Sequence, residues 1–354
     1  MNENKKYYMM GGSIIAVILV LLLSIMLLSS CSSKANYQKI EKKLIKAAEK
    51  AVTNGDVVVV EGSSMIVTSD QLEEAGHLKS LAKMNKDDCS ATVTIMNNGE
   101  SYNYLPNLIC TNYQTKTLKS KIIDDSLTTK DAGLYYDNGE YIFKGTNPNN
   151  IVSFGGSLWF ILKIDASGNL KLLNTEQSAQ YTSWDSKFNT DTNDRSGENV
   201  YENSDIHEVL KAKYDGYKIN ERKHLIPFGV CIGKRTPDNI AKTAYVDCGE
   251  KLEGQYLGLM SPSDYALASY DPDCENILSG SCTNYNYIYK NITSDTWTSK
   301  AMADNSYEVM IYSPGRIRRA TANEMYYYNL VVYVSGDELY TEGDGSVDNP
   351  YVIK

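Results

Sequence analysis

Seven cysteines are the residues of this chain whose type and spacing most clearly allow chemistry. One of them, Cys31, directly follows a run of about twenty apolar residues. The other six form three closely spaced pairs, which are Cys89 and Cys110, Cys231 and Cys248, and Cys274 and Cys282. Such spacing behind an apolar segment is typical of disulfides made in an oxidising compartment. We therefore expect each of the six to bond its nearest neighbour.

Turn signals support two of these pairings. Asn98-Gly99 lies midway between the first two cysteines, and strand-like runs at 91–96 and 102–109 flank it, which predicts a hairpin. Folding at that turn brings the two cysteines close to cross-strand register. A polar turn at 237–239 lies near the midpoint of the second pair in the same way.

The apolar run covers residues 9–28 and contains no charge. At 1.5 Å per residue, about twenty residues span a bilayer core, which predicts a single transmembrane anchor behind a cytoplasmic tail at 1–8. A second interpretation stays open, because Leu28-Ser29-Ser30-Cys31 resembles a bacterial lipobox. That resemblance implies cleavage before Cys31 and a lipid on its thiol. Either interpretation ties the protein to membrane lipid.

Charge is divided unevenly along the chain. The total is −9, yet residues 1–54 carry +5 and residues 55–354 carry −14. The acidic bulk would repel phosphate backbones, so nucleic acid is not an expected partner. Lysines after the apolar run outnumber those before it, which favours a cytoplasmic bulk, but large folded domains can be translocated despite flanking charge. The paired cysteines lead us to expect residues 55–354 outside the cell.

The first part beyond the anchor, residues 34–113, is predicted as a helix followed by a hairpin. Apolar residues at helical spacing mark an amphipathic helix from Tyr37 to Thr53, and Val57–Val60 indicates a strand. Anchor, helix and disulfide-bonded strands together resemble type IV pilin-like and pseudopilin-like proteins. The pilin processing site and its glutamate are missing at Gly11-Gly12, so the resemblance implies a stalk domain of that kind and not filament assembly.

Residues 114–130 are polar and are predicted as a linker, and residues 131–354 as a β-rich domain. The expected fold class is therefore α+β: a transmembrane helix, a small helix-plus-hairpin domain and a larger disulfide-bonded β-rich domain. Four stretches of the last domain resemble an uncharacterised bacterial cell-surface domain, and these are 157–164, 201–204, 258–269 and 343–351. That resemblance implies an extracellular location and an adhesive domain.

The sequence contains none of the common motifs of enzymatic chemistry. The chain has three histidines, none at a zinc spacing, and no nucleotide-binding or hydrolase motif, so we predict no catalytic residue, metal or cofactor. His207 is expected to be solvated in the first turn of a helix. Binding candidates come from a polar loop, where Tyr181, Trp184 and Asp185 could form a carbohydrate site. The alternative for Trp184 is a loop anchor packed onto the core.

These observations predict a single-pass, membrane-tethered protein of the bacterial cell surface whose C-terminal domain binds a glycan or a surface protein. Two rivals remain. One is an extracytoplasmic enzyme acting on cell-wall material through a pair of carboxylates, and the other is a pilus or secretion component.

Overall fold

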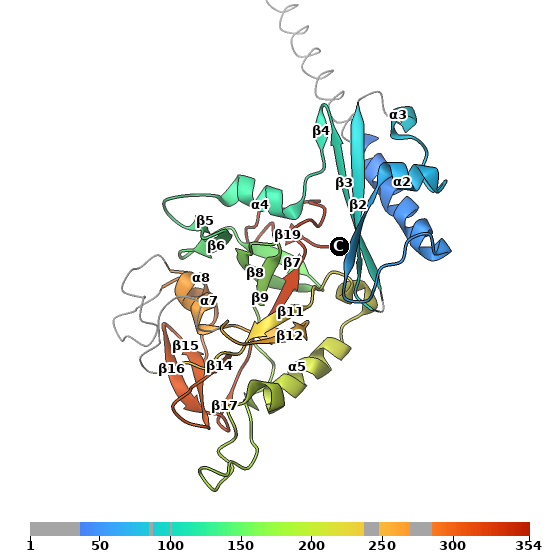
Figure 1. Cartoon of the computed structure of the whole chain (residues 1–354). Coiled ribbons are helices and arrows are strands. Elements are labelled where there is room, and N and C mark those ends of the chain that lie inside the picture. The colour runs from blue at the N-terminus through green and yellow to red at the C-terminus, as the bar shows by residue number, and fades with distance from the viewer. Residues whose placement is uncertain (1–35, 85–87, 100, 237–247, 270–284) are drawn as a thin grey trace, which may run out of the picture. The chain divides into compact units, whose positions relative to one another are not determined.

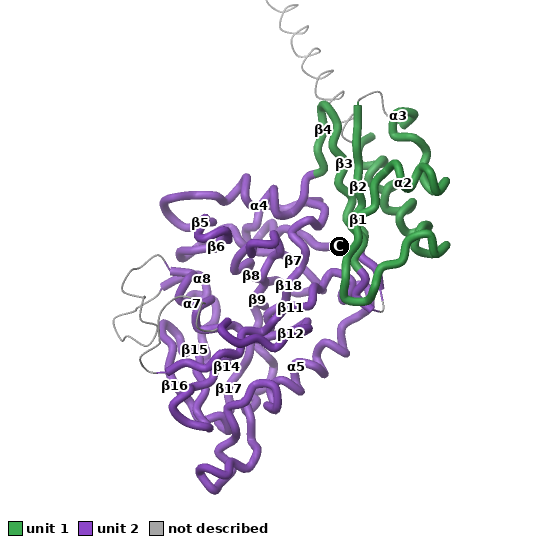
Figure 2. Tube along the Cα trace, in the orientation of Figure 1, with its two compact units in different colours: residues 1–96, 104–115 green, residues 97–103, 116–354 purple. Residues whose placement is uncertain are grey.

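The structure is a computed structural model of the chain and describes residues 36–84, 88–99, 101–236, 248–269 and 285–354. It divides into two compact units (Figure 2), unit 1 with residues up to 96 and 104–115, and unit 2 with residues 97–103 and 116–354. Helices and sheets mix in both, and the larger unit is rich in strands, as predicted.

Five sequence predictions lie outside the described residues. They are the cytoplasmic tail 1–8, the apolar segment 9–28, the lipidation candidate Cys31, the turn at 237–239 and the pair Cys274–Cys282. Among the helices that can be described, none combines the length and the apolar character needed to cross a bilayer.

Unit 1 begins with the amphipathic helix, which is helical from residue 36 to 54. Its buried residues follow the predicted stripe and are Tyr37, Ile40, Leu44, Ala47, Ala48 and Ala51. The helix ends at Gly55, whose φ of 82° suits a residue without a side chain. The predicted strand at residues 57–60 is not formed, and Val58 and Val60 are exposed.

A four-stranded sheet completes unit 1. Its strands are β1 (Ser64–Thr68), β2 (Cys89–Asn97), β3 (Tyr102–Cys110) and β4 (Tyr113–Gln114), with short helices α2 (Ser69–Glu74) and α3 (Leu81–Met84). The turn between β2 and β3 contains Gly99 at a φ of 84°. The predicted bond between Cys89 and Cys110 is confirmed, because the hairpin brings the ends of both strands together.

Unit 2 is built on an eight-stranded sheet (Figure 1). Its strands are β5 (Gly133–Asp137), β6 (Glu140–Lys144), β7 (Ile151–Phe154), β8 (Ser157–Ile164), β9 (Leu170–Asn174), β13 (Gly258–Leu259), β18 (Leu330–Val334) and β19 (Tyr351–Val352). The main path runs β13-β18-β9-β8-β6-β5, and β7 pairs with β8 and, in parallel, with β19. The predicted apolar run at 157–164 is thus a central strand, which explains why it lacks polar alternation.

Smaller elements surround this sheet. A three-stranded sheet contains β14 (Thr296–Ala301), β15 (Glu308–Ser313) and β16 (Arg316–Thr321), and two ribbons pair β10 (Thr182–Ser183) with β17 (Met325–Tyr326) and β11 (Phe228–Cys231) with β12 (Lys251–Gln255). The helices are α4 (Leu118–Ser126), α5 (Asp205–Asp215), α6 (Ile219–Arg222), α7 (Pro262–Leu267) and α8 (Tyr287–Asn291), with a 3-10 turn η1 (Tyr201–Asn203). The predicted bond between Cys231 and Cys248 is also confirmed.

Residues 114–130 are not a plain linker. Thr117 caps α4 by accepting a hydrogen bond from the Ser120 amide, and the helix buries Leu118 and Ile122 in the core of unit 2. Two apolar residues four positions apart share one helical face, but they stand among enough polar residues for the stretch to suggest a linker.

Candidate functional site

The structure separates the three predicted binding residues. Trp184 is fully buried, and its Nε1 donates a hydrogen bond to the Thr298 carbonyl oxygen at 3.1 Å. The prediction of Trp184 as a loop anchor packed onto the core is therefore confirmed, and its candidacy as an exposed binding residue is wrong. Asp185 is also buried and accepts hydrogen bonds from the Glu198 amide at 2.7 Å and the Asp205 amide at 3.3 Å. Both side chains hold the loop in place and present nothing to a ligand.

Tyr181 is the one member of the trio that reaches solvent, with 56% of the residue exposed. Its ring lies beside that of Tyr327, with centroids 4.2 Å apart and an interplanar angle of 30°. Tyr181 stays a candidate contact residue at the surface.

His207 was expected in solvent but is buried. Its Nδ1 lies 2.8 Å from the Glu202 carbonyl oxygen and its Nε2 lies 2.8 Å from Gln255 Oε1. Gln255 is 48 residues away in sequence, so this partner could not be predicted from the position of His207 in the first turn of a helix. Within the described ranges, no three His, Cys, Asp or Glu side chains gather as metal ligands.

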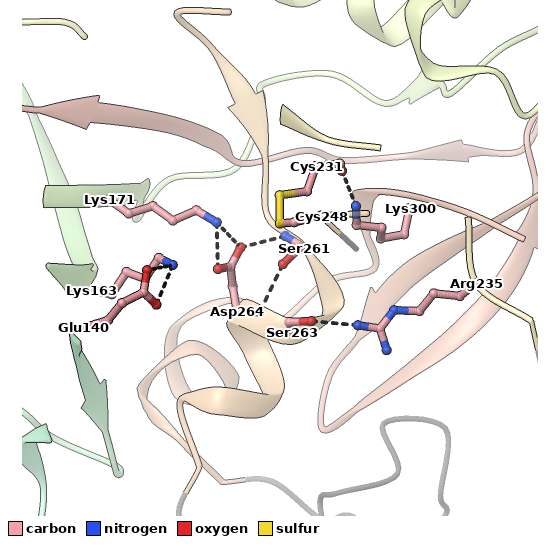
Figure 3. The surroundings of a disulfide bond; sticks show 10 residues. All are labelled: Glu140, Lys163, Lys171, Cys231, Arg235, Cys248, Ser261, Ser263, Asp264 and Lys300. Carbon is pink, nitrogen blue, oxygen red and sulfur yellow. Dashed lines mark hydrogen bonds and ion pairs between the residues drawn. A yellow bond between two sulfur atoms is a disulfide. The ribbon is translucent and has the colours of Figure 1, made fainter. Parts of the chain in front are cut away.

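A hollow of about 470 Å³ in unit 2 is lined by charged, polar and apolar side chains. Strands β6, β8, β9, β11 and β18 and helix α7 contribute to its lining, as do both cysteines of the Cys231–Cys248 bond. We call it the disulfide cleft. Figure 3 shows the disulfide together with four of the charged side chains that line the cleft, Glu140, Lys163, Lys171 and Asp264.

Two lysine–carboxylate pairs line the cleft. Lys171 Nζ lies 2.7 Å from both carboxylate oxygens of Asp264. Lys163 Nζ lies 2.8 and 2.9 Å from the two oxygens of Glu140. The Lys171–Asp264 pair is the more buried, with 13% and 8% of the side chains exposed.

Asp264 is positioned by the cap of α7. Ser261 is the N-cap residue, its hydroxyl accepts from the Asp264 amide, and Asp264 accepts in return from the Ser261 amide at 2.8 Å. Ser261, Pro262 and Asp264 are the residue types that favour a helix start at the N-cap, first and third positions. Burial alone would raise the pKa of Asp264, but the Lys171 ammonium and the Ser261 amide outweigh it and lower the pKa from 3.8. The carboxylate is therefore ionised at neutral pH.

Two buried cationic side chains hydrogen-bond to residues at the disulfide and in the first turn of α7. Lys300 is fully buried and its ammonium donates a hydrogen bond to the Cys231 carbonyl oxygen (Figure 3). Arg235 is fully buried as well and donates to Ser263 Oγ at 2.7 Å. These bonds fix the backbone next to the disulfide and the first turn of α7.

Aromatic and aliphatic side chains form the apolar part of the cleft lining. Phe228 and Tyr333 both line the cleft, with ring centroids 4.6 Å apart. Lys171 Nζ lies 6.0 Å from the centroid of the Tyr333 ring, where a cation is attracted by the face of the ring. Burial raises the pKa of Tyr333, so its hydroxyl stays protonated. The cleft thus offers fixed charges of both signs beside apolar surface.

This arrangement suits recognition better than proton transfer. A carboxylic acid that donates a proton near neutral pH needs a raised pKa, whereas that of Asp264 is lowered. Glu140 is likewise paired with its own lysine. Among the described lining residues there is no histidine. A ligand that carries both charges and apolar groups could contact both pairs and the aromatic wall at once.

Sequence reasoning missed these pairs, although a signal was present. Lys163 and Lys171 interrupt otherwise apolar strands, and a lysine at such a position must find an anion if it is buried. The anion that pairs with Lys171 is Asp264, which lies 93 residues away in sequence. Local sequence therefore could not predict this partner.

The sequence matches no protein-family model, and no similar protein was found among curated proteins or solved structures. The resemblances to pilin-like proteins and to a bacterial cell-surface domain stay predictions.

Proposed function

We propose that this chain is a membrane-tethered protein of the bacterial cell surface whose unit 2 binds an external protein through the disulfide cleft. Location is supported by the apolar segment 9–28, the paired cysteines and the acidic bulk. The ligand class is supported by one observation: the cleft holds two lysine–carboxylate pairs beside an apolar wall. An extended peptide presents the matching set, which is charged side chains of both signs, apolar side chains and backbone amides.

Pre-formed pairs make such a site selective. Each lysine is already held by its carboxylate, so little side-chain ordering is needed when a ligand arrives. A ligand that carries charge of one sign only would be attracted by one member of each lysine–carboxylate pair and repelled by the other. Peptides with an acidic and a basic residue near an apolar one are the expected binders.

A displayed random-peptide library tests this proposal. It is panned against the full chain in lipid nanodiscs, and the recovered peptides are measured against a cleft variant that carries Lys171→Met together with Asp264→Leu. Replacing both partners leaves no unpaired charge, so unit 2 should stay folded. Peptides should lose about tenfold or more in affinity for the cleft variant, equivalent to about 1.4 kcal/mol.

The matched control carries Glu208→Gln with Lys211→Gln. These two residues form an exposed ion pair on α5, 2.9 Å apart, that does not line the cleft. Peptides should bind this control as tightly as the natural chain. Recovery of no peptide, or of peptides that bind the cleft variant equally well, contradicts the proposal.

A further inference from the structure

The exposed face of the helix at 36–54 (blue in Figure 1) is strongly basic. Its exposed lysines are Lys39, Lys42, Lys43, Lys46 and Lys50, against a single exposed acidic residue, Glu49. Lysines four positions apart are neighbours on a helix surface, so Lys46 is repelled by both Lys42 and Lys50. The helix therefore keeps an arrangement of like charges that lowers its own stability.

Three of these lysines line a hollow of about 290 Å³ together with residues that follow α2. We call it the lysine hollow. Its titratable lining residues are Lys43, Lys46, Lys50, His77 and Lys79, and no Asp or Glu occurs among its described lining residues. Four ammonium groups from two separate segments of unit 1 therefore surround one space.

Within the described part of the chain, these four lysines form no ion pair. Lys43 Nζ lies 3.7 Å from Met84 Sδ, and a thioether sulfur is a weak acceptor. His77 differs from the lysines, because its Nε2 lies 2.7 Å from Asp56 Oδ2. The positive charge of the lysine hollow is thus not neutralised by the described residues around it.

Lysines of unit 2 provide a contrast within the same chain. Many of them lie within ion-pair distance of a carboxylate, and these are Lys116, Lys119, Lys121, Lys163, Lys171, Lys187, Lys211 and Lys354. The chain as a whole is acidic, with a net charge of −9, so carboxylates are not scarce. An unneutralised group of lysines in such a chain points to an anionic ligand.

The position of the lysine hollow in the chain indicates which anion this is. The predicted transmembrane segment ends at residue 28, and the first described helix starts at residue 36. The seven residues 29–35 can span at most about 25 Å, and Lys43 lies about 10 Å further along the helix. The bilayer that holds the chain is therefore within reach, and lysines beside a bilayer are attracted to its anionic lipids.

We propose that the lysine hollow binds the head group of an anionic phospholipid and so holds unit 1 against the membrane surface. The phosphate supplies the negative charge that the lysines lack. A zwitterionic head group carries its own cation beside the phosphate, so it should bind more weakly. This inference rests on the membrane tether of the proposed function and is independent of peptide binding by the disulfide cleft.

Native mass spectrometry tests the proposal by counting the lipids bound to the full chain in non-ionic detergent micelles, titrated with phosphatidylglycerol or phosphatidylcholine. Phosphatidylglycerol should bind about tenfold more tightly than phosphatidylcholine. Lys46→Gln together with Lys79→Gln, one lysine from each segment, should remove this preference. The melting temperature of the variant should be unchanged or higher, because both side chains are exposed and Lys46 is repelled by its neighbours.

Lys130→Gln together with Lys213→Gln is the matched control. It makes the same change of charge at two exposed residues of unit 2 that do not line the lysine hollow, and it should keep the lipid preference. Inorganic phosphate or an oligoglutamate peptide, added at constant ionic strength, should not displace phosphatidylglycerol.

Equal affinity of the natural chain for the two lipids would overturn the proposal. So would a preference that survives in the Lys46→Gln, Lys79→Gln variant, a loss shared equally by the control, or displacement by either soluble anion. Peptide binding is measured on the same samples, so that failure of the disulfide cleft is distinguished from failure of the lysine hollow.

Discussion

Replacing Asp264 by alanine lowers the free energy of unfolding of unit 2 by about 3–5 kcal/mol, because Lys171 is left as an uncompensated charge inside the cleft. The pair is mutually 2.7 Å apart and mostly buried, so solvent screens it little. Lost capping at Ser261 adds to the cost. Urea unfolding followed by tryptophan fluorescence measures this, since all three tryptophans, Trp159, Trp184 and Trp297, lie in unit 2.

The double change Lys171→Met with Asp264→Leu separates charge from shape. Removing both ions avoids the unpaired charge, so its cost should be about 1 kcal/mol, mainly from the lost cap. A double variant less stable than Asp264→Ala would contradict our account of the pair.

Acid is expected to break the Lys171–Asp264 ion pair by protonating Asp264. Because the pKa of Asp264 is lowered in the folded protein, its contribution is fully present above the ordinary Asp value of 3.8 and is lost as the pH falls through the folded value below it. The natural chain should therefore lose stability below about pH 4 more steeply than the double variant does.

Replacing Trp184 by alanine is expected to cost about 3–5 kcal/mol, the range for large aromatic residues in cores. The residue is fully buried, packs near Tyr201 with ring centroids 5.9 Å apart, and holds the Thr298 carbonyl oxygen. The same fluorescence is unsuitable here because a tryptophan is removed, so near-ultraviolet circular dichroism in urea measures the loss.

Tyr181→Ala is the control from the same loop. Tyr181 is more than half exposed, so its loss should change stability by no more than about 0.5 kcal/mol. If Trp184→Ala were as mild as Tyr181→Ala, Trp184 would have to be exposed, and the original carbohydrate hypothesis would return.

Local signals predicted a good part of this fold. The Asn98-Gly99 signal predicted both the hairpin and the Cys89–Cys110 bond, because a short turn between two strands brings their far ends together. The helix at 36–54 and the cap of α7 were equally local, because helical spacing and capping depend on residues within a few positions.

The rest depends on contacts that are distant in sequence. Trp184 stands among polar neighbours, yet its partner Thr298 is 114 residues away. The valines at 57–60 have strand propensity but no paired strand, and propensity cannot create one. The cleft could not be predicted from the sequence for the same reason. Its charged pairs join β9 to α7 and β8 to β6, and these elements come together only in the folded unit.

Protease treatment of intact cells tests the central claim most directly, because a binding cleft for an external protein has to lie outside the cell. We predict that the added protease releases peptides from residues 55–354 while a cytoplasmic marker protein stays intact. Protection of residues 55–354 on intact cells, with digestion only after lysis, would place the cleft inside and contradict the proposed function.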